Sequence, residues 1–212
     1  MERNPSNHLH HQGCGCSEEA KRQDPHGLDL FPHIDMKSVD CFNQKNNESI
    51  KNVIRPIEER MDFSKGVCQS GYGKDLVVYI PFNGEIKVKS IIIIGGEDGT
   101  APANMKIYKN VEAVDINILE EKKPIQTLDL NENVTGELEY LLNVSKFNNT
   151  GNIVLGFDEN FGAKNTIIKF IGLKGEKLRE KVQVIETVYE VRANLADHKT
   201  EDDFMVRNNL GM

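Results

Sequence analysis

The sequence contains no tryptophan, and aromatic residues make up only 7% of its 212 residues. Aromatic platforms that stack sugars or single-stranded bases are therefore poorly supplied. No uninterrupted run of about 18 apolar residues occurs, so we expect no membrane-spanning segment and no membrane partner. No apolar segment of the secretory type follows the first residues, which favours a cytoplasmic protein and leaves the nucleus open as a second location.

Cysteine is also scarce, with only Cys14, Cys16, Cys41 and Cys68 present. A secreted disulfide scaffold of this size would be denser in cysteine, so a reducing compartment fits better. We expect Cys41 and Cys68 to be small buried core residues. The spacing of Cys14 and Cys16 is Cys-x-Cys, which differs from the Cys-x-x-Cys of thioredoxin-type redox sites and zinc knuckles.

Catalytic motifs are missing as well. The sequence has no Gly-x-Ser-x-Gly nucleophile elbow, and the glycine-rich turn at 70–73 has no base nearby in sequence. The turn at 95–99 lacks the lysine of a phosphate loop and carries two carboxylates, which leaves a cation site as the alternative to a plain acidic turn. Glu137 and Glu139 lie two apart on an expected strand and should both point into solvent. We therefore predict no catalytic residues and a protein that is not an enzyme.

One cluster of potential metal ligands lies near the start of the chain, formed by His8, His10, His11, Cys14 and Cys16. These are soft ligands, but no strand or knuckle is expected there to preorganise them. We therefore predict no resident metal and no cofactor. Weak adventitious binding is the favoured interpretation, and functional metal binding is the alternative.

The chain is acidic, with 33 acidic and 26 basic residues and a formal net charge of −7. An acidic surface repels phosphate backbones, so we expect no nucleic-acid partner. The apolar content of 38% is enough for one packed core, and the length fits one domain. We expect a monomer with a polar tail at 1–21, a domain at 22–199 and a second polar tail at 200–212.

The domain is expected to be all-β, because apolar residues alternate with polar ones in several short segments. Residues 91–94 form a solid apolar run, so Ile92 and Ile93 should both be buried, on opposite faces of one strand. Pro81-Phe82-Asn83-Gly84 contains a hairpin signal, and 174–176 marks a further turn. Helical periodicity is weak, and only 34–45 and 115–122 are expected to hold a turn or two of helix. The expected strands are 76–80, 86–94, 105–109, 125–130, 138–144, 152–157, 166–173 and 182–191.

Many short strands separated by glycine and asparagine turns predict an antiparallel β-sandwich or jelly roll. Particular segments also resemble the PITH domain family, in one order from about 22 to 199. They include Thr-Gly-Glu-Leu-Glu-Tyr at 135–140 and Ile-Gly-Leu-Lys-Gly-Glu at 171–176. The histidine-rich start with Gly-Cys-x-Cys resembles the stand-alone members, which lack a thioredoxin domain. The other resembling segments are 80–99, 105–110, 160–163, 189–190, 193–194 and 196–199.

The resemblance implies a jelly-roll sandwich like the galactose-binding-like fold. It also implies association with the 26S proteasome, as in the thioredoxin-like relatives, and it supplies no catalytic residues. We therefore expect a non-catalytic protein-interaction or regulatory module. The binding residues are unknown, with loops 95–103 and 161–165 as candidates because loops on a rigid sheet often carry recognition. The alternative is a small-ligand or carbohydrate-binding sandwich, which a concave face with exposed aromatics and amides would favour.

Overall fold

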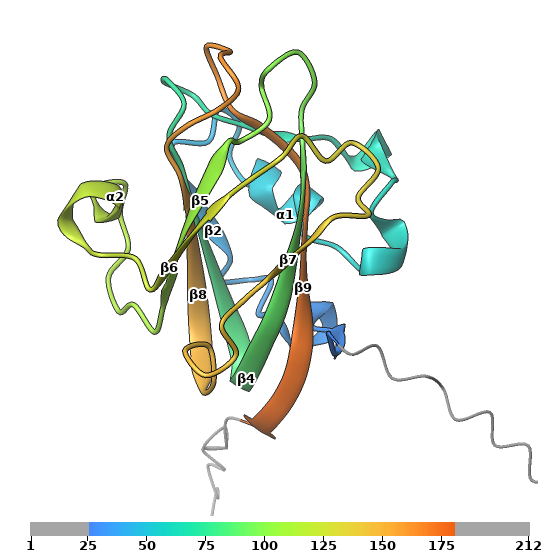
Figure 1. Ribbon diagram of the computed structural model, residues 1–212, viewed down its shortest axis with the longest axis vertical. Helices are drawn as coiled ribbons and strands as arrows, with labels where there is room; N and C mark the ends of the chain where they lie inside the picture. The colour runs from blue at the N-terminus through green and yellow to red at the C-terminus, as the bar shows by residue number, and fades with distance from the viewer. Residues whose placement is uncertain (1–25, 181–212) are drawn as a thin grey trace, which may run out of the picture. The chain divides into compact units, whose positions relative to one another are not determined.

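Strand β4, Leu76–Gly95, bends so that its two halves belong to different layers of a β-sandwich (Figure 1). The computed structural model describes residues 26–180. The first half of β4 pairs with β8, Thr150–Phe157, and the second half pairs with β9, Ile167–Glu180. Both pairings are antiparallel, so the predicted antiparallel sandwich of the jelly-roll type is confirmed.

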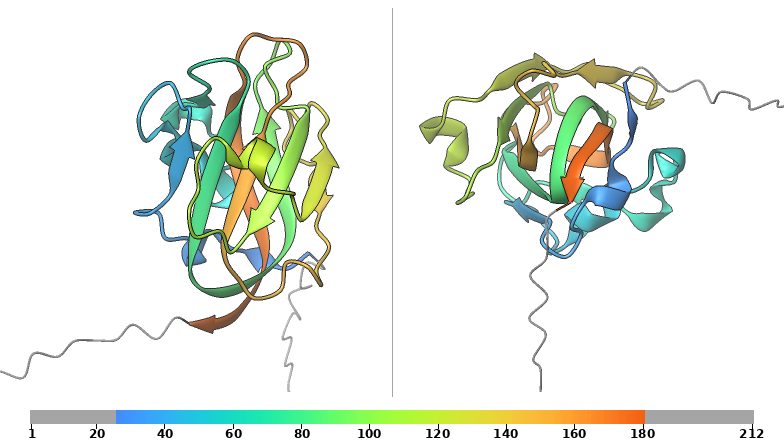
Figure 2. Two further views of the ribbon diagram at one scale, coloured as in Figure 1. Left: turned by 90° about the vertical axis from the view of Figure 1, so that its left-hand side faces the viewer. Right: turned by 90° about the horizontal axis from the view of Figure 1, so that it is seen from below.

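The remaining strands complete the two layers, which enclose the core in the view from below (Figure 2). The first layer also contains β2 (Asp40–Phe42), β5 (Asn104–Lys109) and β6 (Gln126–Asp129). The second layer also contains β1 (Leu28–Asp29), β3 (Cys68–Gln69) and β7 (Glu139–Leu141). The short helices are η1 (Phe31–His33), α1 (Ser49–Val53), η2 (Ile57–Glu59), η3 (Phe63–Lys65) and α2 (Ile118–Glu121).

The hairpin predicted at Pro81–Gly84 is wrong, although the chain does pass from one layer to the other there. The two halves of β4 do not pair with each other, because each finds its partner in a different layer. Phe82 is buried in the core and bridges to Ile34, which fixes this corner. The register shifts between Pro81 and Ile86, as expected where a bulge bends a strand.

Most other predicted elements are confirmed with shifted ends, and two are wrong. The segment 34–45 holds turns and β2 instead of helix, because β2 pairs with β4. The turn predicted at 174–176 is absent because β9 continues through Gly175, where an added Cβ would lie 2.0 Å from the Lys87 carbonyl oxygen. The strand predicted at 182–191 lies outside the described residues. Among residues 26–180, no helix is long and apolar enough to cross a membrane.

Three apolar clusters hold the sandwich together, and β4 contributes to all of them. The largest fills the space between the layers, and the other two lie on the outer faces. Ile93 packs in the central cluster, whereas Ile92 packs with Ile94 and Phe170 on the outer face of the second layer. Both Ile92 and Ile93 are buried, so the prediction of opposite buried faces is confirmed.

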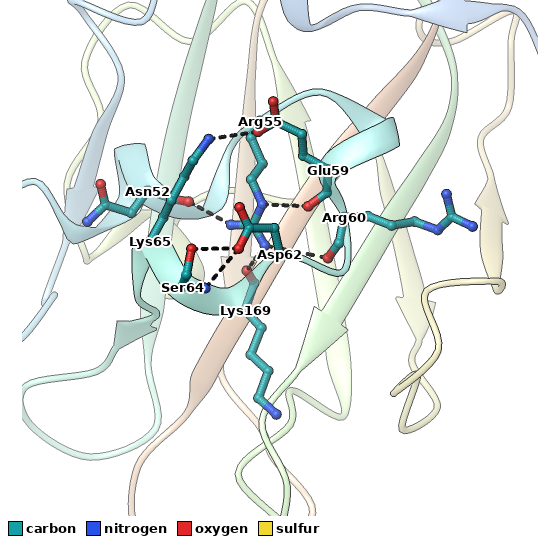
Figure 3. A network of polar contacts seen from close by, with 8 residues as sticks. All are labelled: Asn52, Arg55, Glu59, Arg60, Asp62, Ser64, Lys65 and Lys169. Atoms are coloured by element: carbon teal, nitrogen blue, oxygen red, sulfur yellow. Dashed lines mark hydrogen bonds and ion pairs between the residues drawn. The ribbon is translucent and has the colours of Figure 1, made fainter.

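The outer cluster of the second layer is covered by residues 54–65, and Arg55 anchors this segment (Figure 3). Arg55 is 3% exposed, and its guanidinium donates hydrogen bonds to backbone carbonyls just before the segment, in the middle of the segment and on β9. Nε bonds Glu59 O at 3.0 Å, Nη1 bonds Asn52 O at 2.7 Å, and Nη2 bonds Lys169 O at 3.2 Å. The guanidinium also lies 5.4 Å from the ring centroid of Phe170. Burial lowers the pKa of Arg55.

Polar contacts close the sandwich along its two open sides. On one side, Gln126 of β6 donates to Leu141 O of β7 at 3.3 Å and accepts from Asn143 N at 2.9 Å. On the other side, β2 meets β3 through a bridge between Gln44 and Ser70. We call this second junction the β2–β3 seam. Both junctions occupy hydrogen-bonding groups at the edges of the two layers, which would otherwise be open to pairing with strands of other chains.

Candidate interaction surface

Three loops meet at one end of the sandwich, residues 70–75, 95–103 and 158–166 (at the top of Figure 1). They gather there because β4 bends, which brings both of its ends to the start of β9. The Thr166 hydroxyl donates to Lys74 O at 2.6 Å, just before β4 begins. Gly96 N donates to Ile167 O at 2.9 Å, just after β4 ends. We call this group of loops the loop end.

Buried hydroxyl groups join the first of these loops to the third. Ser70 and Thr166 are both fully buried. Thr166 N donates to the Ser70 hydroxyl at 2.9 Å, and that hydroxyl donates to Gly73 O at 2.6 Å. The side chain of Asn165 donates to Ser70 O at 3.0 Å. The turn at 70–73 is therefore held by defined hydrogen bonds.

Backbone hydrogen bonds join the second loop to the third. Ala103 N donates to Glu159 O at 2.8 Å, and Phe161 N donates to Ala101 O at 3.3 Å. Gly99 has a φ of +76°, and an added Cβ would lie 3.0 Å from Phe161 O. Only glycine fits this position without strain, because the loops approach closely where the backbone is left-handed. The loops 95–103 and 161–165, which the sequence marks as candidates, are thus held against each other.

Two aromatic side chains project from these fixed loops. Tyr72 is 89% exposed and Phe161 is 43% exposed. The backbone of Tyr72 is clamped by Asn43, whose amide donates to Tyr72 O at 2.7 Å and accepts from Tyr72 N at 3.0 Å. The loop backbone is therefore ordered without any contribution from the exposed ring. In a chain with so few aromatic residues, this placement suits recognition.

The acidic turn at 95–99 is partly neutralised. Lys169 Nζ lies 2.6 Å from a Glu97 carboxylate oxygen, and this hydrogen bond lowers the pKa of Glu97. Asp98 is exposed and has a left-handed φ of 55°. Across residues 26–180, no three His, Cys, Asp or Glu side chains converge as metal ligands. The predicted His8–Cys16 cluster lies outside the described residues.

A cluster of polar side chains around Glu139, which was not predicted, lies on the outer face of the second layer. Glu137 and Glu139 were both expected to point into solvent. Glu137 is exposed as expected, but the side chain of Glu139 is largely covered. His26 Nδ1 lies 2.6 Å from Glu139 Oε2, Ser90 donates to the same oxygen at 3.3 Å, and Lys174 donates to Oε1. Burial acts to raise the pKa of Glu139, but the bonds from Lys174 and His26 outweigh it and lower the pKa. No short motif reveals this site, because its members are far apart in sequence.

A hollow of about 690 Å³ lies beside β1 and the far end of β9. It is a candidate ligand site because it is the size of a small-molecule pocket. No phenylalanine or tyrosine is among its lining residues, and the one aromatic ring that lines it is the imidazole of His33. Its lining includes Leu28, Leu30, Pro32, Lys89, Glu176 and Lys177.

Comparison with solved structures finds partial matches to CBM32 domains. The CBM32-1 and CBM32-2 domains from Clostridium perfringens ZmpB align with a TM-score of 0.48 and 16% identity, covering 69% of this chain and 36% of that chain. The CBM32-3 domain from a family 31 glycoside hydrolase of the same organism aligns with a TM-score of 0.43 and 13% identity, covering 68% of this chain and 95% of that chain.

Comparison with protein families gives a closer match. PITH domain-containing protein 1 of Mus musculus is 39% identical over 196 residues, which cover 89% of this chain and 92% of the relative. The protein of the same name in Dictyostelium discoideum is 35% identical over 182 residues, covering 83% of this chain and 90% of the relative. The PITH domain model matches residues 20–193. The chain therefore belongs to the PITH domain family.

Proposed function

We propose that this protein is a non-catalytic interaction module that binds a protein partner through the loop end. The observation that carries the proposal is the exposure of Tyr72 and Phe161 on loops whose backbones are fixed by hydrogen bonds. Exposed aromatic residues supply large contact areas, and ordered loops reduce the entropy lost on binding. The names of the relatives refer to a domain and to no reaction, which agrees with a binding role.

The 26S proteasome is the first partner to test, in the cytoplasm or the nucleus. This choice rests on the family resemblance, because thioredoxin-like relatives associate with that particle. If the PITH domain itself carries the affinity, a chain without a thioredoxin domain keeps it. With a net charge of −7, the chain should meet a basic patch on its partner. Added salt should therefore slow association more than dissociation.

The experiment mixes purified 26S particles with the full chain and separates them by sedimentation. We expect co-sedimentation, and we expect the double variant Tyr72→Ala, Phe161→Ala to weaken it at least about tenfold. The matched control is Leu141→Ala, which removes a side chain of similar exposure from β7, on the outer face of the second layer. All three proteins should unfold at nearly the same temperature, because hydrogen bonds outside the substituted side chains hold the loop backbones.

Two results would count against the proposal. If the chain stays in the free fraction at low and physiological salt, the proteasome is not its partner. If it binds but the double variant binds equally well, the loop end is not the surface used.

The second candidate function is small-ligand binding in the hollow beside β1. Its support is the size of the hollow and the mixture of apolar and charged residues around it. The absence of Phe and Tyr from the lining disfavours carbohydrate. Thermal shift in the presence of mono- and disaccharides tests this candidate. A saturable shift that is lost in Lys89→Ala would favour the hollow over the loop end.

A further inference from the structure

Cys41 and Cys68 face each other at the β2–β3 seam. Cys41 lies on β2 in the first layer, Cys68 lies on β3 in the second layer, and both are buried. Their Sγ atoms are 4.0 Å apart, although the residues are 27 positions apart in sequence. Both thiols are free. The prediction that both are buried is confirmed, but no sequence signal indicated that they meet.

We propose that Cys41 and Cys68 form a reversible internal disulfide when a peroxide reaches the seam, and that this bond ties the two layers together. A disulfide has an S–S distance of about 2.05 Å, so the two sulfur atoms must approach by roughly 2 Å. Rotation of the two side chains, with a small shift of β2 or β3, is a movement of this size. The proposal does not depend on the proposed function at the loop end.

The two thiols are hydrogen-bonded to each other, and either sulfur can be the donor. This hydrogen bond and burial raise the pKa of Cys41, and burial opposes ionisation of Cys68 as well. Whichever sulfur attacks the oxidant, the other lies in place to act second, as the resolving thiol.

The reaction proceeds in two balanced steps. The sulfur of one thiol attacks one oxygen of hydrogen peroxide, so that an S–O bond forms, the O–O bond breaks and one water leaves. The sulfur of the other thiol then attacks this sulfenic acid, so that the S–S bond forms and the second water leaves with the proton of the second thiol. Two electrons pass from the thiols to one peroxide.

The bond should stabilise the domain, because it constrains the unfolded chain and joins strands of different layers. For a loop of this length, we expect the melting temperature to rise by about 5–10 °C. Cys41 precedes Asn43 by two positions, and Cys68 precedes Ser70 by two. The crosslink therefore lies next to the contacts that hold Tyr72 and its loop. Because both thiols are buried, the reaction should be slower than that of an exposed thiol.

The experiment uses the full chain with Cys14→Ser and Cys16→Ser, so that only two thiols remain. The folded protein is treated with hydrogen peroxide, quenched, alkylated in denaturant and examined by mass spectrometry. We expect a mass lower by two hydrogen atoms, no alkylation, a peptide crosslink between Cys41 and Cys68, and a higher melting temperature. Dithiothreitol should reverse all four changes.

The matched controls are Cys41→Ala and Cys68→Ala in the same background, since alanine leaves no unpaired buried hydroxyl. Peroxide should not raise the melting temperature of either variant. If a control variant does not fold, the peptide map of the parent protein decides alone. The proposal is overturned if the folded parent keeps both thiols alkylatable under peroxide that oxidises the same chain in urea. Oxidation to sulfinic acid without a crosslink, or a crosslink that lowers the melting temperature, overturns it equally.

Discussion

The two outer faces of the sandwich are covered by segments that are held in different ways. Over the first layer, residues 111–122 pack apolar side chains, among them Ile118 and Leu119, against the outer face of the sheet. Over the second layer, residues 54–65 are held by Arg55, whose guanidinium bonds backbone carbonyls and stacks on aromatic rings. We call these segments the apolar cover and the arginine cover.

The difference concerns how the stabilising free energy is distributed. In the apolar cover it is spread over several side chains, so the loss of one leaves the others in place. In the arginine cover, Ile57 and Phe63 also pack on the sheet, but several directional bonds come from one side chain, and removal of Arg55 takes a donor from three partly buried carbonyls. We therefore expect the arginine cover to respond more strongly to a single substitution.

The largest effect is expected beneath both covers, at Ile93 in the central cluster. Ile93→Asp places an unpaired charge between the layers, and its cost of about 5 kcal/mol or more is comparable to the stability of a domain. Far-UV and near-UV circular dichroism should show an unfolded chain. Ile92→Asp should also unfold the protein, whereas Ile93→Val should cost only about 1 kcal/mol. A folded Ile93→Asp variant would contradict the assignment of the central core.

Arg55→Met should have the next largest effect, destabilising the protein by about 3 kcal/mol because the carbonyls of residues 52 and 169 lose the guanidinium donor and that of residue 59 keeps only its bond from Asp62 N. Hydrogen exchange should show faster opening of residues 54–65 than of 111–122. Arg55→Lys is the matched control, and it should recover part of the loss because it keeps the charge but not the fork of donors. A methionine variant as stable as the natural protein would show that this cover is held by packing.

Leu119→Ala in the apolar cover should cost about 2 kcal/mol, measured by urea denaturation. Leu119 packs closely over Gly156 of β8, where an added Cβ would lie 2.3 Å from Leu119 Cδ2. Leu119→Met keeps the volume and should cost less than about 1 kcal/mol. If Leu119→Ala were more damaging than Arg55→Met, the contrast between the covers would be reversed.

Glu139 should give a smaller, pH-dependent effect next to the arginine cover. Its pKa is lowered in the folded protein, so its contribution is present above the ordinary carboxyl pKa and is lost as pH falls through the lowered value. Glu139→Gln should destabilise the protein by about 1 kcal/mol at neutral pH. Urea titrations from acid to neutral pH should show this difference shrinking in acid. A difference that is constant with pH would mean that the charge of Glu139 contributes nothing.

Removal of residues 1–21 should have the smallest effect, with no change in melting temperature beyond about 2 °C, because that segment has no apolar pattern to pack. Scanning calorimetry measures this directly. Loss of cooperative unfolding would place part of the domain before residue 22. Neither cover should change its hydrogen-exchange rate in the shortened chain.

The candidate sites were only partly predictable. The loops 95–103 and 161–165 could be named in advance, because turn residues mark where strands end. The hydrogen bonds that clamp Tyr72 could not, since Asn43 lies far from it in sequence and belongs to another strand end. The same holds for Glu139 and its partners, and for the contact between Cys41 and Cys68. Polar and thiol pairs of this kind leave no periodic pattern in a sequence.

The sequence alone determined the all-β class, most of the strands and the burial of Ile92 and Ile93. Alternating and continuous apolar residues indicate which faces of a strand become buried when the chain folds. The motifs also determined the family. Only the tertiary structure decided that β4 crosses between layers instead of forming a hairpin, and that Arg55 anchors a cover. The pairing partner of a strand and the acceptor of a buried donor are set by long-range contacts, whose free energy exceeds local turn preference.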